Sequence, residues 1–183
     1  MKILSTPIRD LMVVRGCPII DKRGAFSRLY CEEELAPVID SRRIVQVNHS
    51  TTVKVGTVRG LHFQHPPHTE MKFVRCIKGK IWDVAVDLRA DSATFLNWHA
   101  TQLSPSNGSM MVIPEGFAHG FQCLEEDSEL LYLHTAFYNH EAERRINYGD
   151  PILNIHWPIP VTDLSLKDAQ CGFLKHDYEG MTL

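Results

Sequence analysis

The chain has 183 residues, a charged fraction of 22% and a formal net charge of -3. This length suits one domain, residues 1–183, and the charge gives no broad basic surface that would attract nucleic acid. No apolar run approaches the roughly 20 residues that cross a bilayer, and an Arg-Asp pair interrupts the apolar start before a signal-peptide core can form. The composition therefore predicts a soluble, cytoplasmic protein with neither nucleic acid nor membrane as a partner.

The five cysteines are widely spaced, odd in number and form no C-x-x-C pair. A disulfide framework needs paired cysteines in an oxidising compartment, and a zinc knuckle needs closely spaced ones. We therefore expect the cysteines to be reduced and to bind no metal.

Short alternating stretches dominate the predicted elements. After a short helix at CEEELAPVI (residues 31–39), apolar and polar residues alternate in KFVRCI (72–77), KIWDVAVDL (80–88), SMMVIPEGF (109–117) and ELLYLHTAF (129–137). Turn-forming residues separate these stretches, as they separate successive β-strands. A second short helix is predicted at SLKDAQ, within a docked tail after Trp157-Pro158. Neither helix is long enough to connect parallel strands, so the pattern favours an all-β sandwich or barrel.

Alternation also predicts which side chains face the interior. Tyr132 and His134 share one face of their strand, so both can face the inside of a barrel. Lys72 shares a face with Val74 and Cys76, which are apolar. Because a buried ammonium is costly without an anionic partner, Lys72 is expected to meet a carboxylate or an anionic ligand.

Two motifs have the spacing of cupin barrels. The segment GSMMVIPEGFAHGF contains Gly-x5-Pro-x-Gly-x2-His, which ends at His119 and fits the second cupin motif. Gly56-x5-His62 fits part of the first motif, but Gln64 occupies the place of the second histidine of the usual His-x-His. That substitution disfavours a bound metal, because three or four strong ligands normally hold a catalytic metal.

Each candidate residue also has a structural interpretation. An inward histidine such as His119 more often satisfies internal hydrogen bonds than takes part in catalysis. Tyr132 is, on spacing alone, more often a filler of an amphipathic core, and a strand histidine such as His62 is as often solvated as functional. His65 and His68, in a Pro-Pro turn, are predicted to be solvated loop residues.

Taken together, VRGLHFQ, KFVRCIKGKIWDVAVDLR, IPEGFAHGF and ELLYLHTAFY closely resemble the dTDP-4-dehydrorhamnose 3,5-epimerase family. DKRGAF, NHS, DP, WP and LSLKD occur in the same order as in that family. The resemblance implies a cupin-type jelly-roll homodimer that uses no cofactor. It also implies inversion of C3, C5 or both in a nucleotide-linked 4-keto-6-deoxyhexose, during deoxysugar biosynthesis for surface polysaccharide or glycosylated products.

The resemblance implies four catalytic residues. A proton beside a ketone is weakly acidic, so its removal needs a base and a group that holds the resulting oxyanion. By resemblance, His62 is the base, Lys72 holds the oxyanion, and Asp168 hydrogen-bonds His62 and fixes its tautomer. Tyr132 matches the acid that returns the proton to the opposite face, and a tyrosine with the ordinary pKa of about 10 carries that proton at neutral pH.

The resemblance also implies a set of substrate-binding residues. Arg23 and Arg59 match positions that grip the diphosphate, where one guanidinium can bind two oxygens. The segment from Arg23 to Arg28 is implied to reach the partner's site in the dimer. The implied set is Arg23, Phe26, Arg28, Gln46, Asn48, Arg59, His119, Tyr138 and Glu143.

Three positions depart from the family pattern. Arg28 stands where a glutamate that contacts thymine is common; because a guanidinium only donates and cytosine offers acceptors, Arg28 favours a CDP-linked sugar. Glu70-Met71-Lys72 replaces Gln-Gly-Lys, and Phe137-Tyr138 replaces a pair of tyrosines. These changes surround the sugar, so the sequence leaves open whether C3, C5 or both are inverted.

Three other functions compete with the epimerase. A metal-dependent cupin enzyme would need a histidine-rich triad, where this chain has Gln64. A keto-sugar ketoisomerase of the same fold is not expected to retain Lys72 together with Tyr132. A non-catalytic sugar-nucleotide-binding cupin is expected to lack the base or the acid, whereas His62 and Tyr132 are both present.

Overall fold

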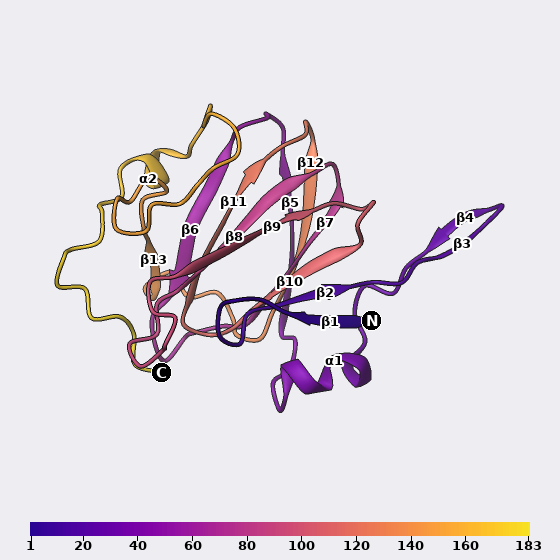
Figure 1. The fold of residues 1–183 in the computed structure, drawn as a ribbon, viewed down its shortest axis with the longest axis horizontal. Helices are drawn as coiled ribbons and strands as arrows, with labels where there is room; N and C mark the ends of the chain where they lie inside the picture. Colours follow the sequence, from indigo (N-terminus) through magenta and orange to yellow (C-terminus); the bar gives the residue numbers. More distant parts are fainter.

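The computed structural model describes residues 1–183, whose framework is two antiparallel sheets that face each other (Figure 1). The larger sheet contains, in spatial order, β1 (Lys2–Ser5), β2 (Met12–Arg15), β10 (Ser109–Ile113), β7 (Lys72–Lys78), β12 (Ser128–His134) and β5 (Gln46–Thr52). The smaller sheet contains β13 (Glu143–Arg145), β6 (Val58–Gln64), β11 (Phe117–Cys123), β8 (Ile81–Asp87) and β9 (Trp98–Leu103). The prediction of an all-β sandwich is confirmed.

A hairpin and two short helices complete the structure. The hairpin, β3 (Ile19–Asp21) and β4 (Gly24–Phe26), extends away from both sheets (Figure 1). The helices are α1 (Glu32–Ile39) and α2 (Leu166–Ala169), at the two places where the sequence predicts them. Neither helix is long and apolar enough to cross a membrane.

Apolar side chains form three clusters, one between the sheets and one on the outer face of each. The inner cluster includes Val74 of β7, Leu130 of β12 and Phe121 of β11. On the outer face of the larger sheet, α1 covers a cluster that includes Phe73. On the outer face of the smaller sheet, the C-terminal tail covers a cluster that includes Leu61. Because both faces of both sheets are buried, apolar residues occur on the inward-facing and on the outward-facing positions of the strands.

The alternation of β7 and β12 positions the polar residues as predicted. Val74 and Leu130 lie in the core between the sheets, and Lys72, Tyr132 and His134 continue the same faces into a cavity. The face of each strand is therefore apolar at one end and polar at the other. Polar side chains of the cavity therefore lie beside the core on the same uninterrupted strands.

The stretch 109–117 forms two strands, where the sequence analysis predicted one. β10 ends at Ile113, a turn follows through Pro114 and Glu115, and β11 begins at Phe117. The turn forms because proline has no N–H to donate to a ladder and Gly116 has a φ of 82°, a conformation that favours glycine. The second cupin motif therefore spans two strands that lie in different sheets.

The tail after β13 docks on the smaller sheet. The indole of Trp98 on β9 donates to the carbonyl of Leu153 at 2.9 Å, and, beyond Trp157-Pro158, the carbonyl of Ile159 accepts a hydrogen bond from the side-chain amide of Gln122 on β11 at 2.8 Å. The prediction of a docked tail is confirmed, and this docking brings α2 beside β6. That residues 1–183 act as a single domain stays a prediction.

β6 and β11 approach closely where a glycine from each strand meets the other. A Cβ on Gly60 would lie 2.5 Å from the Cα of Gly120 and 2.8 Å from the carbonyl oxygen of His119. The φ of Gly60 is 126°, a region that other residues rarely adopt. The same ladder pairs His62 directly with His119, so the close approach sets the position of both histidines.

We expect Gly60→Ala to lower the free energy of unfolding by about 3 kcal/mol, because backbone strain and overpacking each cost about 1 to 3 kcal/mol. Chemical denaturation measures the change. Gly172→Ala is the matched control, because a Cβ there would meet no heavy atom within 4 Å. Equal losses in the two variants would contradict this account of Gly60.

Candidate active site

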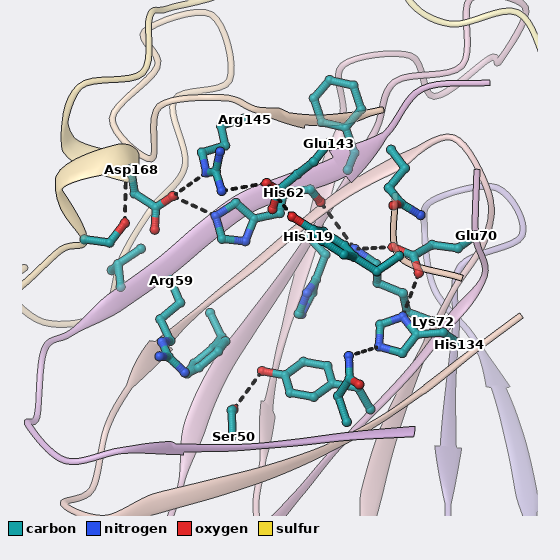
Figure 2. Close-up of a pocket in the computed structure, with 18 of the residues that line it drawn as sticks. Ser50, Arg59, His62, Glu70, Lys72, His119, His134, Glu143, Arg145 and Asp168 are labelled. Atoms are coloured by element: carbon teal, nitrogen blue, oxygen red, sulfur yellow. Dashed lines mark hydrogen bonds and ion pairs between the residues drawn. The ribbon is translucent and has the colours of Figure 1, made fainter. Parts of the chain in front are cut away.

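A cavity of about 880 Å³ opens between the two sheets. Strands of both sheets and the segment around α2 supply its walls (Figure 2). In Figure 2, His62, Asp168 and Arg145 form one group of side chains, and Glu70, Lys72 and His134 form another. The cavity thus contains two separate clusters of charged groups.

The first cluster is built on His62 of β6 and Asp168 of α2. Nε2 of His62 lies 2.7 Å from a carboxylate oxygen of Asp168, whose side chain is 4% exposed. Ser165 caps α2 by accepting a hydrogen bond from the backbone N–H of Asp168 at 3.1 Å, which fixes the carboxylate. Burial raises the pKa of Asp168, but the hydrogen bond and charge of His62 outweigh it, so the pKa lies below its ordinary value.

The ionised Asp168 determines the tautomer of His62. A carboxylate only accepts, so the neutral imidazole carries its proton on Nε2 and donates it to Asp168. Nδ1 is then the free basic nitrogen. The pair is therefore suited to abstract a proton through Nδ1 and to stabilise the imidazolium that forms.

Arg145 of β13 joins this cluster and was missed by the sequence analysis. It lies directly opposite His62 in the ladder between β13 and β6. Its Nε lies 3.2 Å from the same oxygen of Asp168, close enough for an ion pair but without hydrogen-bond geometry, and its Nη2 donates to Glu143 at 2.8 Å. Asp168 therefore shares its charge between an imidazole and a guanidinium. No motif marks Arg145, because its role depends on the pairing of two strands far apart in the sequence.

Tyr132 of β12 lies in the opposite sheet from His62. Its hydroxyl is 3.2 Å from the hydroxyl of Ser50 on β5. Burial raises the pKa of Tyr132 well above its ordinary value. The phenol therefore keeps its proton at neutral pH, which is the form in which a tyrosine can act as an acid.

The second charged cluster gives Lys72 the anionic partner that the sequence analysis expected. Nζ of Lys72 lies 3.2 Å from Oε1 of Glu70, and Oε2 of Glu70 accepts a hydrogen bond from Nδ1 of His134 at 2.7 Å. Nζ also lies 3.5 Å from the backbone carbonyl oxygen of His62. The ammonium is thus held close to the first cluster by a carboxylate that the sequence singled out only as a departure from the family pattern.

His119 of β11 is paired with a carboxylate outside the cavity. Its Nε2 lies 2.7 Å from Asp83 of β8, which is fully buried. Burial raises the pKa of Asp83 and outweighs the opposing effect of His119. His119 lines the cavity, and its Asp83 hydrogen bond agrees with the structural interpretation given above. A part in substrate binding stays a prediction.

Four of the other predicted binding residues line the cavity: Asn48, Arg59, Tyr138 and Glu143. Gln46 does not line it but binds two groups at its rim, donating to the side chain of Asn48 at 3.3 Å and accepting from the backbone N–H of Tyr138 at 3.0 Å. The hydroxyl of Tyr138 donates to Glu143 at 3.2 Å.

The structure does not bring Arg23, Phe26 and Arg28 to this cavity. All three belong to the hairpin or the segment just after it. Arg23 is bound to Asp21, and Arg28 forms an ion pair with Glu34 of α1. A role for these three in the binding site of the same chain is therefore unsupported, and only a second chain could bring them to a cavity.

The side-chain amide of Gln64 forms hydrogen bonds with the backbone of two loops. It donates to the backbone carbonyls of His68 and Phe137 at 2.9 and 3.3 Å and accepts from the backbone N–H of Asn139 at 2.6 Å. The residue that replaces the second cupin histidine thus has a structural role at the rim. The structure contains no group of three or more His, Cys, Asp or Glu side chains placed to hold a metal ion.

The two sheets enclose the cavity in the manner of a cupin-type jelly roll, and the acid and base groups inside it are those of an enzyme. The chain belongs to the dTDP-4-dehydrorhamnose 3,5-epimerase family, whose model matches residues 5–176. It is therefore an isomerase, and the predicted family and fold class are confirmed.

Known proteins support this assignment along most of the chain. A dTDP-4-dehydrorhamnose 3,5-epimerase of Sinorhizobium fredii is 40% identical over 166 residues, which is 90% of this chain and 85% of that protein. The crystal structure of such an epimerase from Elizabethkingia anophelis has a TM-score of 0.90 and 36% identity, covering 97% of this chain and 98% of the other. A Legionella pneumophila 3,5-epimerase in complex with dTDP-4-keto-L-rhamnose has a TM-score of 0.87 and 37% identity, covering 92% and 89%.

We expect Asp168→Asn to lower kcat by about a hundredfold or more while KM changes little, because the amide leaves the imidazolium without its counter-charge. Steady-state kinetics measures both constants. Asp177→Asn, an exposed carboxylate in the same tail, is the control and should keep the parent's activity. A kcat that is the same in both variants would show that the pair has no role in the reaction.

Proposed function

We propose that this protein inverts C3 and C5 of a dTDP-linked 4-keto-6-deoxyhexose. The observation that carries the proposal is the position of His62 and Tyr132 in facing sheets of one cavity. Inversion requires removal of a proton from one face of a carbon and its return to the other. A base and an acid on opposite walls meet this requirement.

The proposed reaction begins with Nδ1 of His62 taking a proton from a carbon beside the ketone. The electrons of the C–H bond move into the enolate, whose oxygen is stabilised by the ammonium of Lys72. Tyr132 then donates its proton to the opposite face of the carbon and the ketone reforms. Electrons stay within the substrate throughout, so no redox cofactor is needed.

C3 and C5 both flank the C4 ketone, so one oxyanion site can serve both inversions. We propose a double epimerase because His62, Lys72 and Tyr132 are all placed for this chemistry. Inversion at only one carbon is the alternative, and it rests on the changes at Glu70-Met71-Lys72 and Phe137-Tyr138 around the sugar.

The proposed nucleotide is dTDP, which the Legionella relative binds as its keto-sugar. Arg59 lines the cavity and has a guanidinium suited to the diphosphate. Arg28 is the residue that favours CDP, but one nitrogen of its guanidinium already pairs with Glu34 of α1. The relative turnover of the dTDP-linked and CDP-linked sugars identifies the preferred nucleotide.

Solvent exchange in D2O tests the reaction. We expect the protein, incubated with dTDP-4-keto-6-deoxyglucose, to incorporate deuterium at C3 and C5, located by NMR. His62→Gln should abolish exchange, because the base is lost. Tyr132→Phe should exchange without inversion, because the enolate still forms but is reprotonated on its original face.

Other outcomes of this experiment identify the alternatives. Deuterium at one carbon only would mark a single epimerase, and faster turnover of the CDP-linked sugar would support the role of Arg28. Movement of the ketone from C4 to C3 would identify a ketoisomerase. Binding of both sugars without exchange would reject the epimerase and favour a binding protein, and loss of exchange on chelation would favour a metal enzyme.

We propose further that the hairpin completes the cavity of a second chain in a homodimer. Three of its apolar residues, Ile19, Ile20 and Phe26, are 68%, 74% and 68% exposed. Clustered apolar side chains that pack on nothing in their own chain indicate a surface for a partner. The hairpin also carries Arg23, a predicted ligand of the diphosphate.

Mixing two inactive variants tests this arrangement. We expect a mixed dimer of His62→Gln and Arg23→Ala/Phe26→Ala chains to regain activity, since one of its two cavities combines an intact His62 with the partner's intact hairpin. Co-expression followed by kinetics measures the recovery. No recovery in verified mixed dimers, or a monomer by light scattering, would reject the proposal.

A further inference from the structure

Glu70, Lys72 and His134 are three polar side chains that are almost buried at the edge of the cavity. Their exposed fractions are 9%, 10% and 9%. Lys72 and His134 come from adjacent strands and are directly paired in the ladder between β7 and β12, whereas Glu70 precedes β7. Glu70 joins the other two, with one carboxylate oxygen on each.

The hydrogen bonds of His134 fix the direction in which Glu70 points. Gln46 donates to Oδ1 of Asn48 at 3.3 Å, which leaves the amide nitrogen of Asn48 to donate to Nε2 of His134 at 3.2 Å. Nδ1 of His134 then carries the proton and donates to Glu70 at 2.7 Å. Glu70 is thus held by a chain of hydrogen bonds that begins at the backbone N–H of Tyr138, at the rim.

Glu70 is the only carboxylate within ion-pair distance of Lys72. Burial raises the pKa of Glu70, but the His134 hydrogen bond and the charge of Lys72 outweigh it, so the pKa lies below its ordinary value. Asp83 also acts on Lys72 by its charge, yet it is paired with His119 on β11. The other titratable side chains around the cavity near Lys72 are His62 of β6 and Tyr132 and His134 of β12.

We propose that Glu70, oriented by His134, is a positioning residue that holds the ammonium of Lys72 directed toward the ketone oxygen of the substrate. The inference rests on the proposed function, in which Lys72 stabilises the enolate. An ammonium held on one side by a fixed carboxylate keeps its remaining N–H groups free for the developing oxyanion. Donors held in place before the reaction need no reorganisation as charge forms.

Glu70→Gln tests the inference, because it keeps the shape of the side chain and removes its charge. Loss of an oxyanion donor lowers kcat by about 10² to 10³. Loss of only the carboxylate that holds the donor should lower kcat by less, about tenfold, with little change in KM.

Two further variants separate charge from structure. Glu70→Asp keeps the charge on a shorter side chain, so it should recover part of the kcat that Glu70→Gln loses. Glu129→Gln is the matched control, since Glu129 also joins a histidine and a lysine, His49 at 3.0 Å and Lys78 at 3.4 Å, but with a more exposed carboxylate. It should leave kcat unchanged.

A double-mutant cycle with Lys72→Met shows whether Glu70 acts through Lys72. The Glu70→Gln change should have no further effect on the deuterium exchange rate once Lys72 is absent. An effect of equal size in both backgrounds would overturn the inference.

An unchanged kcat in Glu70→Gln would also overturn it, while exchange by the parent would leave the proposed function standing. Absence of exchange in the parent would overturn both. Thermal unfolding of each variant shows whether lost activity reflects lost folding.

Discussion

The cost of burying charge between two apolar sheets determines how this site is built. An isolated ion in such a place would be driven to neutrality, so each buried charge needs a partner at hydrogen-bond distance. Asp168 is paired with His62, Asp83 with His119, and Glu70 with both Lys72 and His134. The pairing that makes these groups tolerable inside the fold also sets their protonation, which is the property that proton transfer requires.

Strands carry one set of residues in the cavity, and connecting segments carry their charged partners. His62, Lys72 and Tyr132 lie on three strands of the two sheets, so their separation is set by strand pairing and by the packing between sheets. Their partners Glu70 and Asp168 lie outside these strands, one just before β7 and one in the docked tail. Strands therefore position the groups proposed to react, and connecting segments supply their charged partners.

Alternation predicted four of the strands, β7, β8, β10 and β12, and the inward faces of β7 and β12, because alternation is a local property. The four catalytic candidates came from the family resemblance instead. The sequence did not predict Arg145 or the partner of Lys72, since these depend on which strands become neighbours. It extended β10 as far as Phe117, because the apolar pattern continues through a turn whose signal is only Pro114 and Gly116. Arg23 and Phe26 lie away from the cavity of their own chain, because the hairpin that carries them pairs with neither sheet.

The docked tail has a consequence for how the protein loses activity. Asp168 reaches His62 only while the tail packs on the smaller sheet, through contacts that include the indoles of Trp98 and Trp157. Segments held by fewer contacts than the core open at a lower free energy than the whole structure. If Asp168 supports His62 as proposed, heating that releases the tail would remove the carboxylate while both sheets stay intact, so inactivation would precede unfolding of the barrel.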